Sequence, residues 1–414
     1  MYALKPSHVF VHRRLRSNPL AVARMDRMLA ALGNPPVTEI DASDTAAVLA
    51  LAGPAPGTPR VAGRVRQGVE RRPQDPSLIF NTFVWDESQR QKTHPCAAAA
   101  DVQSQRIARL LAGVGEEFAF SHRERLVVDG RQYVCQGGWG IHSLKGCPHK
   151  CDYCEEGYYL NIMCDVEEFV EHVYQMTLRR PQQKLYRYDL FSDQIALEPE
   201  YGASAALAEM FARTGDKFLL YYTKSDNVEH LLDLPKSNAI FYCTLATQTV
   251  CREIERGTPS MSERIEALRR CQQAGYRVRV GFSPIIPVPD WKREATECLE
   301  KLFAVVRPET VRLWVLSLMS PSECELLIGP KRLDRRFLEA MRSPAAMAES
   351  AWSQPFPRQA RAEIYAHYLD EIRRISPGTP VTLCSEEPQV WEMLAGKLQM
   401  RPEDLYCCCG GTSA

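Results

Sequence analysis

The chain has 414 residues with 51 basic and 51 acidic side chains, so its net charge is zero and no global field favours nucleic acid or a membrane surface. The first six residues lack the apolar run of a signal peptide, and no stretch reaches the ~20 apolar residues of a membrane helix. Fifteen cysteines without an export signal predict a cytoplasmic protein with reduced thiols, some of them used for metal chemistry.

Residues 1–135 are predicted to form an N-terminal extension. Residues 8–12 favour a strand, and the spacing of apolar residues predicts helices over 21–32 and 101–114. The Pro- and Gly-rich stretch 53–68 predicts an exposed connection. Basic residues between Arg60 and Arg72 could contact phosphates, but a solvated linker is the simpler interpretation.

From residue 136 the pattern changes to strands that alternate with helices, which is typical of a parallel sheet with crossover helices. Six strands are predicted, over 136–144, 184–191, 218–223, 239–246, 277–286 and 310–318. Helices are predicted over 166–179, 203–214 and 261–274. The expected fold is therefore α/β, a partial (β/α)6 TIM-type barrel over 136–325, with functional residues at the C-terminal strand ends.

Residues 326–414 are predicted to form a helical C-terminal region with a cysteine-rich tail. Residues 337–341 and 361–374 favour helices, and 380–383 favour a strand that ends at Cys384. Three consecutive cysteines, Cys407 to Cys409 with Cys408 at the centre, precede two glycines. They could form a soft-metal or metalloid site, a second cluster with Cys384, a hydrogen-donating thiol, or a tail without a role.

The stretch from Gly146 to Cys154 carries three cysteines in the pattern C-x3-C-x2-C. Soft thiolates at Cys147, Cys151 and Cys154 can hold three irons of a cubic [4Fe–4S] cluster, which leaves one iron open to another ligand. The alternatives are a zinc site or three buried thiols, although zinc more often uses four ligands in paired Cys-x2-Cys units.

With Tyr153 in the aromatic position before the last cysteine, this loop resembles the cluster loop of radical S-adenosyl-L-methionine (SAM) enzymes. The resemblance implies that SAM chelates the open iron. It also implies reductive cleavage of a carbon–sulfur bond in SAM, which usually releases a 5′-deoxyadenosyl radical. Such an enzyme needs an electron donor, for example flavodoxin or ferredoxin.

Three polar residues lie at predicted strand ends and suit the polar groups of SAM. Lys224 is a candidate partner for its carboxylate, and Ser192 and Thr244 are candidate hydrogen-bonding neighbours. Each of them could instead cap a strand or a helix.

The order of segments between residues 136 and 320 resembles spore photoproduct lyase and its relatives. The segments that carry the resemblance are Ser192–Pro199, Tyr222–Lys224, Val228–Asp233, Phe241–Val250, Glu255–Thr258, Arg264–Ala267, Ala274–Tyr276, Pro284–Ile286 and Trp291. The SAM contacts of the family fall on Ser192, Lys224 and Thr244. The family repairs a thymine dimer in DNA and returns a hydrogen atom through a cysteine and two tyrosines.

The repair residues of the family are only partly present. Leu190 occupies the position of the hydrogen-donor cysteine, and one tyrosine position keeps Tyr153 while the other is Glu155. Glu155 and Glu156 could orient a basic substrate or the ammonium of SAM, or form a solvated turn. Cys164 could replace the missing thiol donor or be an ordinary buried thiol.

We therefore predict a radical SAM enzyme that acts on a small molecule or a nucleotide. DNA repair is a second hypothesis, and no membrane partner is expected. A third hypothesis is transfer of the 3-amino-3-carboxypropyl group of SAM to trivalent arsenic, because the cysteine-rich tail loosely resembles that of an enzyme of arsenic-antibiotic biosynthesis. A non-enzymatic metal-binding module is the fourth.

Overall fold

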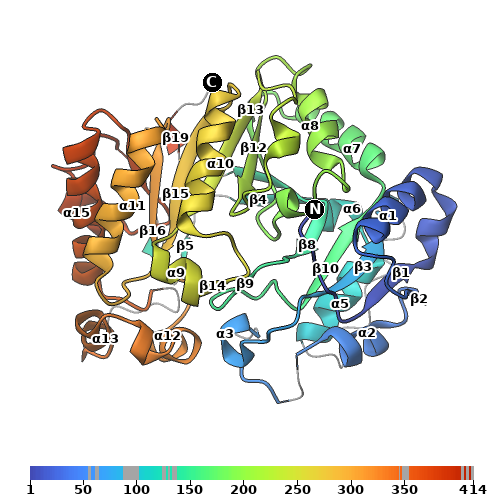
Figure 1. Ribbon diagram of the computed structural model, residues 1–414, viewed down its shortest axis with the longest axis horizontal. Helices are drawn as coiled ribbons and strands as arrows, with labels where there is room; N and C mark the ends of the chain where they lie inside the picture. The colour runs from blue at the N-terminus through green and yellow to red at the C-terminus, as the bar shows by residue number, and fades with distance from the viewer. Residues whose placement is uncertain are drawn as a thin grey trace. The chain divides into compact units, whose positions relative to one another are not determined.

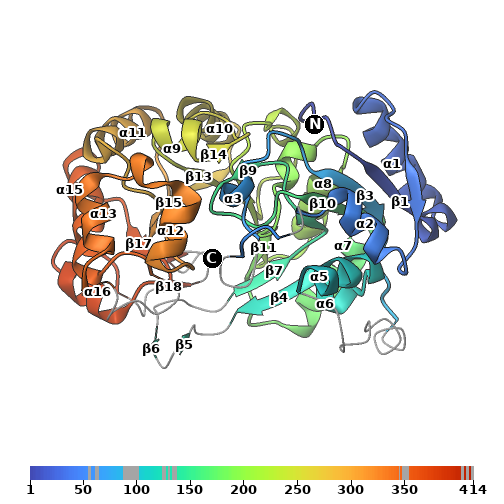
Figure 2. The same cartoon turned by 90° about the horizontal axis from the view of Figure 1, so that it is seen from below.

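The computed structural model describes residues 1–54, 57–60, 65–86, 102–123, 127–128, 131–132, 138–344, 346, 354–401, 405–406 and 410–411. The chain divides into two compact units (Figures 1 and 2). The first unit comprises Met1–Ser121, Trp139–Leu219 and Glu229–Asn238, and the second comprises His122–Gly138, Leu220–Val228 and Ala239–Ala414. The division into segments 1–135, 136–325 and 326–414 stays a prediction.

A five-stranded sheet lies in the first unit, in the order β2-β1-β3-β10-β8. Its strands are β1 (Val9–His12), β2 (Thr38–Ile40), β3 (Ser77–Asn81), β8 (Leu144–Gly146) and β10 (Tyr159–Met163). All pairs are parallel except β8 with β10. Every residue of β3 and β10 is buried, which fits central strands without solvent on either face.

The helices of this unit include α1 (Pro19–Ala31), α2 (Thr45–Ala52) and α5 (Val102–Ala112). Helix α1 begins where Asn18 Oδ1 accepts from the amides of Leu20 and Ala21, both at 3.1 Å, and proline occupies the first turn. The unit also contains β7 (Gly138–Ile141) parallel to β11 (Leu185–Tyr188), and the helices α7 (Val166–Arg179) and α8 (Ala203–Phe211).

In the second unit, strands of one sheet follow the order β17-β16-β15-β13-β12. Its strands are β12 (Phe218–Thr223), β13 (Ala239–Leu245), β15 (Arg277–Ile285), β16 (Val311–Val315) and β17 (Val381–Leu383). The helices are α9 (Gln248–Glu253), α10 (Met261–Gln273), α11 (Trp291–Val305), α12 (Pro321–Ile328), α13 (Arg335–Met341), α15 (Arg358–Ile375) and α16 (Pro388–Leu394). Figure 1 shows α10, α11 and α15 alongside β13, β15 and β16.

The two faces of this sheet differ in chemistry. Register pairs place one set of side chains on a common face, from Thr244 and Gly281 through Arg312 to Thr382. The alternate residues on the other face are apolar and buried: Phe241, Cys243, Leu245, Val278, Val280, Phe282, Val311, Leu313, Val381 and Leu383. The apolar face packs against helices, and the face that carries Thr244 and Arg312 is polar.

The predicted α/β fold with parallel strands is confirmed, and several boundaries agree to within two residues. Helix α7 and strand β12 match their predicted ranges, whereas β3, β10 and α11 are not among the predicted elements. The interpretation of residues 60–72 as a solvated linker is wrong for their second half, because α3 (Gln67–Glu70) begins at two buried residues, Gln67 and Gly68. Every described helix is too short or too polar to cross a bilayer.

Candidate functional site

The cysteine loop connects β8 to β10 in the first unit. Gly146 starts it with φ = +101°, and a Cβ at this position would collide with the carbonyl oxygen of Tyr159 on the paired strand. Only glycine fits there. The loop is closed by hydrogen bonds from Cys147 N to Glu156 O (2.5 Å) and from Cys154 N to Cys151 O (2.9 Å).

The three cysteines of the loop form no disulfide with another described residue and lie close enough to influence one another. Burial is the largest cause that raises the pKa of Cys147 well above its usual value. The negative charges of Asp193, Cys154 and Cys151 raise this pKa further. Burial, with a smaller contribution from the negative charge of Glu156, raises the pKa of Cys154 to about 11. Among the described residues no three His, Cys, Asp or Glu side chains converge as ligands of a single ion. A cubic cluster requires less convergence, because each cysteine binds a different iron, so the loop fits that group as a donor set.

The loop rests on the segment that follows β11. Gly146 N donates to Phe191 O at 3.1 Å, and His149 Nε2 lies 3.0 Å from Asp193 Oδ2. These contacts flank Ser192, whose buried Oγ has no hydrogen-bond partner among the described residues. The structure thus brings Ser192 to the three cysteines, with a hydroxyl that has unused bonding capacity.

Glu155 and Glu156 do not form a solvated turn, so that alternative is wrong. Glu156 is 6% exposed and lies 2.5 Å from Arg106 and 3.4 Å from Lys145, and Glu155 lies 3.4 Å from Arg106. Burial opposes ionisation of Glu156, but Lys145 and Arg106 together hold its pKa below the usual range. The chain therefore supplies its own cations to these carboxylates.

The other residues predicted around the loop have different environments. Cys164 is fully buried, its thiol donates weakly to Ile162 O at 3.7 Å, and burial raises its pKa, which favours a packing role. Tyr153 is half-buried and its carbonyl accepts from Arg66 Nη1 at 2.6 Å. Catalytic roles for Tyr153, Glu155 and Cys164 stay predictions. Cys407 to Cys409, including Cys408, lie outside the described residues.

Lys224 and Thr244 belong to the second unit. Lys224 Nζ lies 2.7 Å from Glu255 Oε1, and Arg264 Nη1 lies 2.7 Å from Glu255 Oε2. Arg264 Nη1 also donates to Thr244 O at 3.0 Å. One carboxylate thus joins two cations, and the group of three keeps a formal charge of +1 beside Thr244, which suits an anionic ligand.

Hydroxyl groups beside this charged group have unused bonding capacity. Thr244 Oγ1 and Ser283 Oγ are buried and find no hydrogen-bond partner in the part of the chain that the structure describes. Lys224 Nζ also donates to Ser283 O at 3.2 Å, which places the two residues together. A buried hydroxyl without a partner costs about 1–3 kcal/mol, so two of them near one cation indicate a ligand-binding surface.

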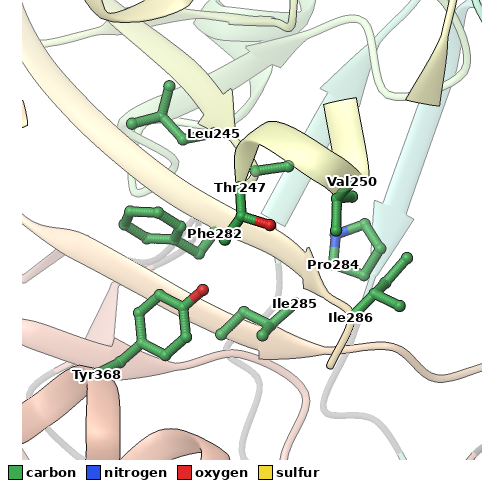
Figure 3. Close-up of a pocket in the computed structure, with 9 residues that line it drawn as sticks. Leu245, Thr247, Val250, Phe282, Pro284, Ile285, Ile286 and Tyr368 are labelled. Carbon is green, nitrogen blue, oxygen red and sulfur yellow. The ribbon is translucent and has the colours of Figure 1, made fainter. Parts of the chain in front are cut away.

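A small pocket lies on the other face of the same sheet (Figure 3). Leu245, Val250, Phe282, Ile286 and Tyr368 are among the residues that line it. Leu245 and Thr244 are neighbours on β13, so their side chains lie on opposite faces. This apolar pocket is therefore separated from the polar face by the sheet itself.

Sequence reasoning missed two further polar groups. His142, directly after β7, connects Asp189 Oδ1 (3.0 Å) to Ser121 Oγ (2.9 Å). Burial lowers the pKa of His142 and raises that of Asp189, so neither environment favours the charged form. The only available signal was position, since His142 and Asp189 lie near the C-terminal ends of predicted strands.

The second group missed lies on the polar face of the second unit. Arg312 Nη2 donates to Tyr222 OH at 2.7 Å, and the rings of Tyr222 and Tyr242 stack with centroids 4.8 Å apart. The guanidinium carbon of Arg312 lies 5.1 Å from the centroid of the Tyr242 ring. No local sequence pattern connects these three strands, so only the sheet register reveals the group.

Comparison with known proteins relates the chain to one family. The pattern that describes the spore photoproduct lyase family matches residues 136–319. Spore photoproduct lyases of Clostridium acetobutylicum and Bacillus subtilis are 23% identical over 166 residues and 26% identical over 182 residues. These matches cover 38% and 42% of this chain, and the chain spans about half the length of these relatives, 49% and 53%.

Solved structures of spore photoproduct lyase variants share the fold over most of the chain. A variant with bound AdoMet and dinucleoside spore photoproduct superposes with a TM-score of 0.60 at 17% identity, covering 92% of this chain and 99% of that chain. A variant with the dinucleoside spore photoproduct superposes with a TM-score of 0.61 at 17% identity, covering 92% and 100%. Residues 136–319 of this chain are thus similar in sequence to spore photoproduct lyases, and most of the chain shares the fold of their solved structures.

Proposed function

We propose that this protein is a radical SAM enzyme that acts on a small molecule or a nucleotide. The observation that carries the proposal is the three-cysteine loop, which is docked on the segment of Ser192 within a radical SAM fold. When bound there, a [4Fe–4S] cluster would supply the electron that cleaves SAM reductively. Flavodoxin or ferredoxin is the proposed source of that electron, and the cytoplasm, where thiols stay reduced, is the proposed location.

The residues of the chain divide the binding work by their chemistry. Cys147, Cys151 and Cys154 would hold the cluster as thiolates. Ser192 and Thr244 would accept or donate hydrogen bonds to SAM, since their hydroxyls have no other partner among the described residues. Lys224 would hold the SAM carboxylate, because the group it forms with Glu255 and Arg264 retains one positive charge.

The substrate class follows from what the chain lacks. By the resemblance described above, Leu190 takes the position of the family's hydrogen-donor cysteine, and a hydrocarbon side chain has no labile hydrogen to return to a product radical. Glu155 stands at the second tyrosine position and pairs with Arg106. We therefore favour a substrate other than a thymine dimer.

DNA repair is the second candidate, because relatives in the comparison are spore photoproduct lyases. It requires a thiol other than one at position 190 to return the hydrogen atom. DNA-dependent SAM cleavage with repair of a dinucleoside photoproduct would establish this candidate, and SAM cleavage that DNA does not change would exclude it.

The deciding experiment is anaerobic reconstitution with iron and sulfide, reduction with dithionite, and chromatography of the SAM products. Methionine with 5′-deoxyadenosine is the expected outcome. Methylthioadenosine would instead indicate 3-amino-3-carboxypropyl transfer, with trivalent arsenic as the acceptor to test. Iron binding without SAM turnover would indicate a metal-binding module, and full turnover by Cys147→Ala would contradict the cluster assignment.

A further inference from the structure

Residues 66–71 hold the backbone of the cysteine loop, although they precede it by about eighty residues. Three successive loop carbonyls accept hydrogen bonds from this segment. Asp152 O accepts from Gly68 N at 2.7 Å, Tyr153 O from Arg66 Nη1 at 2.6 Å, and Cys154 O from Gln67 N at 2.8 Å. Figure 2 shows α3 beside β9 (Lys150–Cys151), the strand that carries the second cysteine.

A charge pair joins the same two segments. The guanidinium of Arg71 contacts Asp152 Oδ2. Asp152 lies between Cys151 and Cys154 in the sequence, and its side chain is fully buried. A buried carboxylate is costly unless it is paired, and Arg71 is a cation that pairs with this one.

The backbone of Arg71 supports this interpretation. Arg71 ends α3 in the left-handed region, with φ = +47°, and its amide donates to Gln67 O at 2.8 Å. A non-glycine residue in this region carries a strain of roughly 1–2 kcal/mol. An ion pair to a buried partner is the kind of interaction that holds a residue there.

We propose that residues 66–71 form a clamp that positions the cysteine loop and that Arg71 sets its charge by neutralising Asp152. This inference rests on the proposed function, since it concerns an iron–sulfur cluster bound by Cys147, Cys151 and Cys154. Negative charge near such a cluster disfavours the added electron, and positive charge favours it. The clamp residues are positioning residues, because they act through the loop.

The charge pair predicts shifts of opposite sign. Arg71→Gln leaves a buried carboxylate beside the cluster, so the reduction potential moves to a more negative value. Asp152→Asn leaves the guanidinium without its carboxylate, so the potential moves to a more positive value. The double variant Arg71→Gln/Asp152→Asn removes both charges and returns the potential close to that of the wild type. A purely structural role would not produce this pattern.

The test is a redox titration of the reconstituted full-length protein, followed spectroscopically under anaerobic conditions. Iron content and the rate of iron loss to a chelator are measured in parallel, and Arg71→Gln is expected to lose iron several-fold faster. Arg72→Gln is the matched control, because Arg72 lies over the Tyr158 ring at 5.3 Å. The potential of this control should stay unchanged.

The outcomes separate the clamp from the proposed function. A wild type that binds no iron overturns both. A cluster whose potential is unchanged in the two single variants, or shifts in the same direction in both, overturns the clamp and leaves the proposed function intact. If Arg71→Gln alone does not hold a cluster, recovery in the double variant supports the charge pair, and failure of the double variant contradicts it.

Discussion

The cysteine loop of the first unit and the polar sheet face of the second unit differ in how many of their polar groups find a partner within the chain. Around the loop, carbonyls accept from residues 66–68, and the carboxylates of Asp152 and Glu156 contact cations of the chain. On the sheet face, the hydroxyls of Thr244, Ser283 and Thr382 are buried without a hydrogen-bond partner within the described residues.

The difference indicates which part each region contributes. The loop is already held by the protein, as preorganised metal ligands should be. The sheet face has buried hydroxyl groups that folding leaves without hydrogen bonds, and a bound ligand can supply those bonds. The following experiments test this contrast.

The largest expected effect is loss of the cluster. Cys151→Ala removes one of three ligands, so we expect reconstituted protein to lose sulfide-to-iron charge-transfer absorption and nearly all bound iron. Cys164→Ala is the control, because that thiol is buried away from the loop contacts and should leave iron content unchanged. Equal iron content in both variants would contradict the ligand assignment.

Arg264→Met tests the charged group of the second unit. The guanidinium is fully buried and contacts Glu255, so its loss should lower the free energy of unfolding by about 3–5 kcal/mol. Chemical denaturation measures this. Arg269→Met on the same helix is the control, since its pair with Glu266 is exposed to solvent and should contribute little to stability.

Thr244→Val separates binding from stability. Removal of a buried hydroxyl without a partner should leave stability unchanged or raise it by about 1 kcal/mol, whereas SAM affinity should fall by about ten-fold. Denaturation and equilibrium dialysis give the two values. Thr249→Val is the opposite case, because its hydroxyl donates to Glu294 at 2.6 Å, and it should lose stability without losing SAM affinity.

The smallest effect concerns a histidine outside both regions. Burial, with a smaller contribution from the positive charge of Arg14, lowers the pKa of His12 from 6.5 to about 4. The Nδ1 atom of His12 accepts a hydrogen bond from Arg14 N at 3.3 Å. Below pH 6.5 the unfolded chain binds a proton that the folded chain does not, so stability should fall progressively as the pH drops from 6.5 to 4. His12→Gln should flatten this slope in denaturation curves at several pH values. An unchanged slope would assign the acid sensitivity to other groups.

The local features of the fold could be predicted from the sequence. Apolar spacing predicted α7, because helical periodicity reflects which face is buried, and apolar runs predicted the strands β12, β13 and β15. It failed for β10, which follows the cysteine loop directly and pairs with β3 from the N-terminal region. A strand that is buried along its whole length shows no alternation, so its pairing cannot be deduced from its own residues.

In the candidate site, too, some features follow from the sequence and others only from the tertiary structure. The sequence by itself determined the donor set, because the spacing of Cys147, Cys151 and Cys154 is local and their chemistry belongs to the side chains. Only the tertiary structure decided which charges are neutralised, since Arg71 meets Asp152 across 81 positions and Lys224 meets Glu255 across 31. Such pairs form when distant segments are buried together, and desolvation, which makes an unpaired charge costly, acts only after the chain has folded.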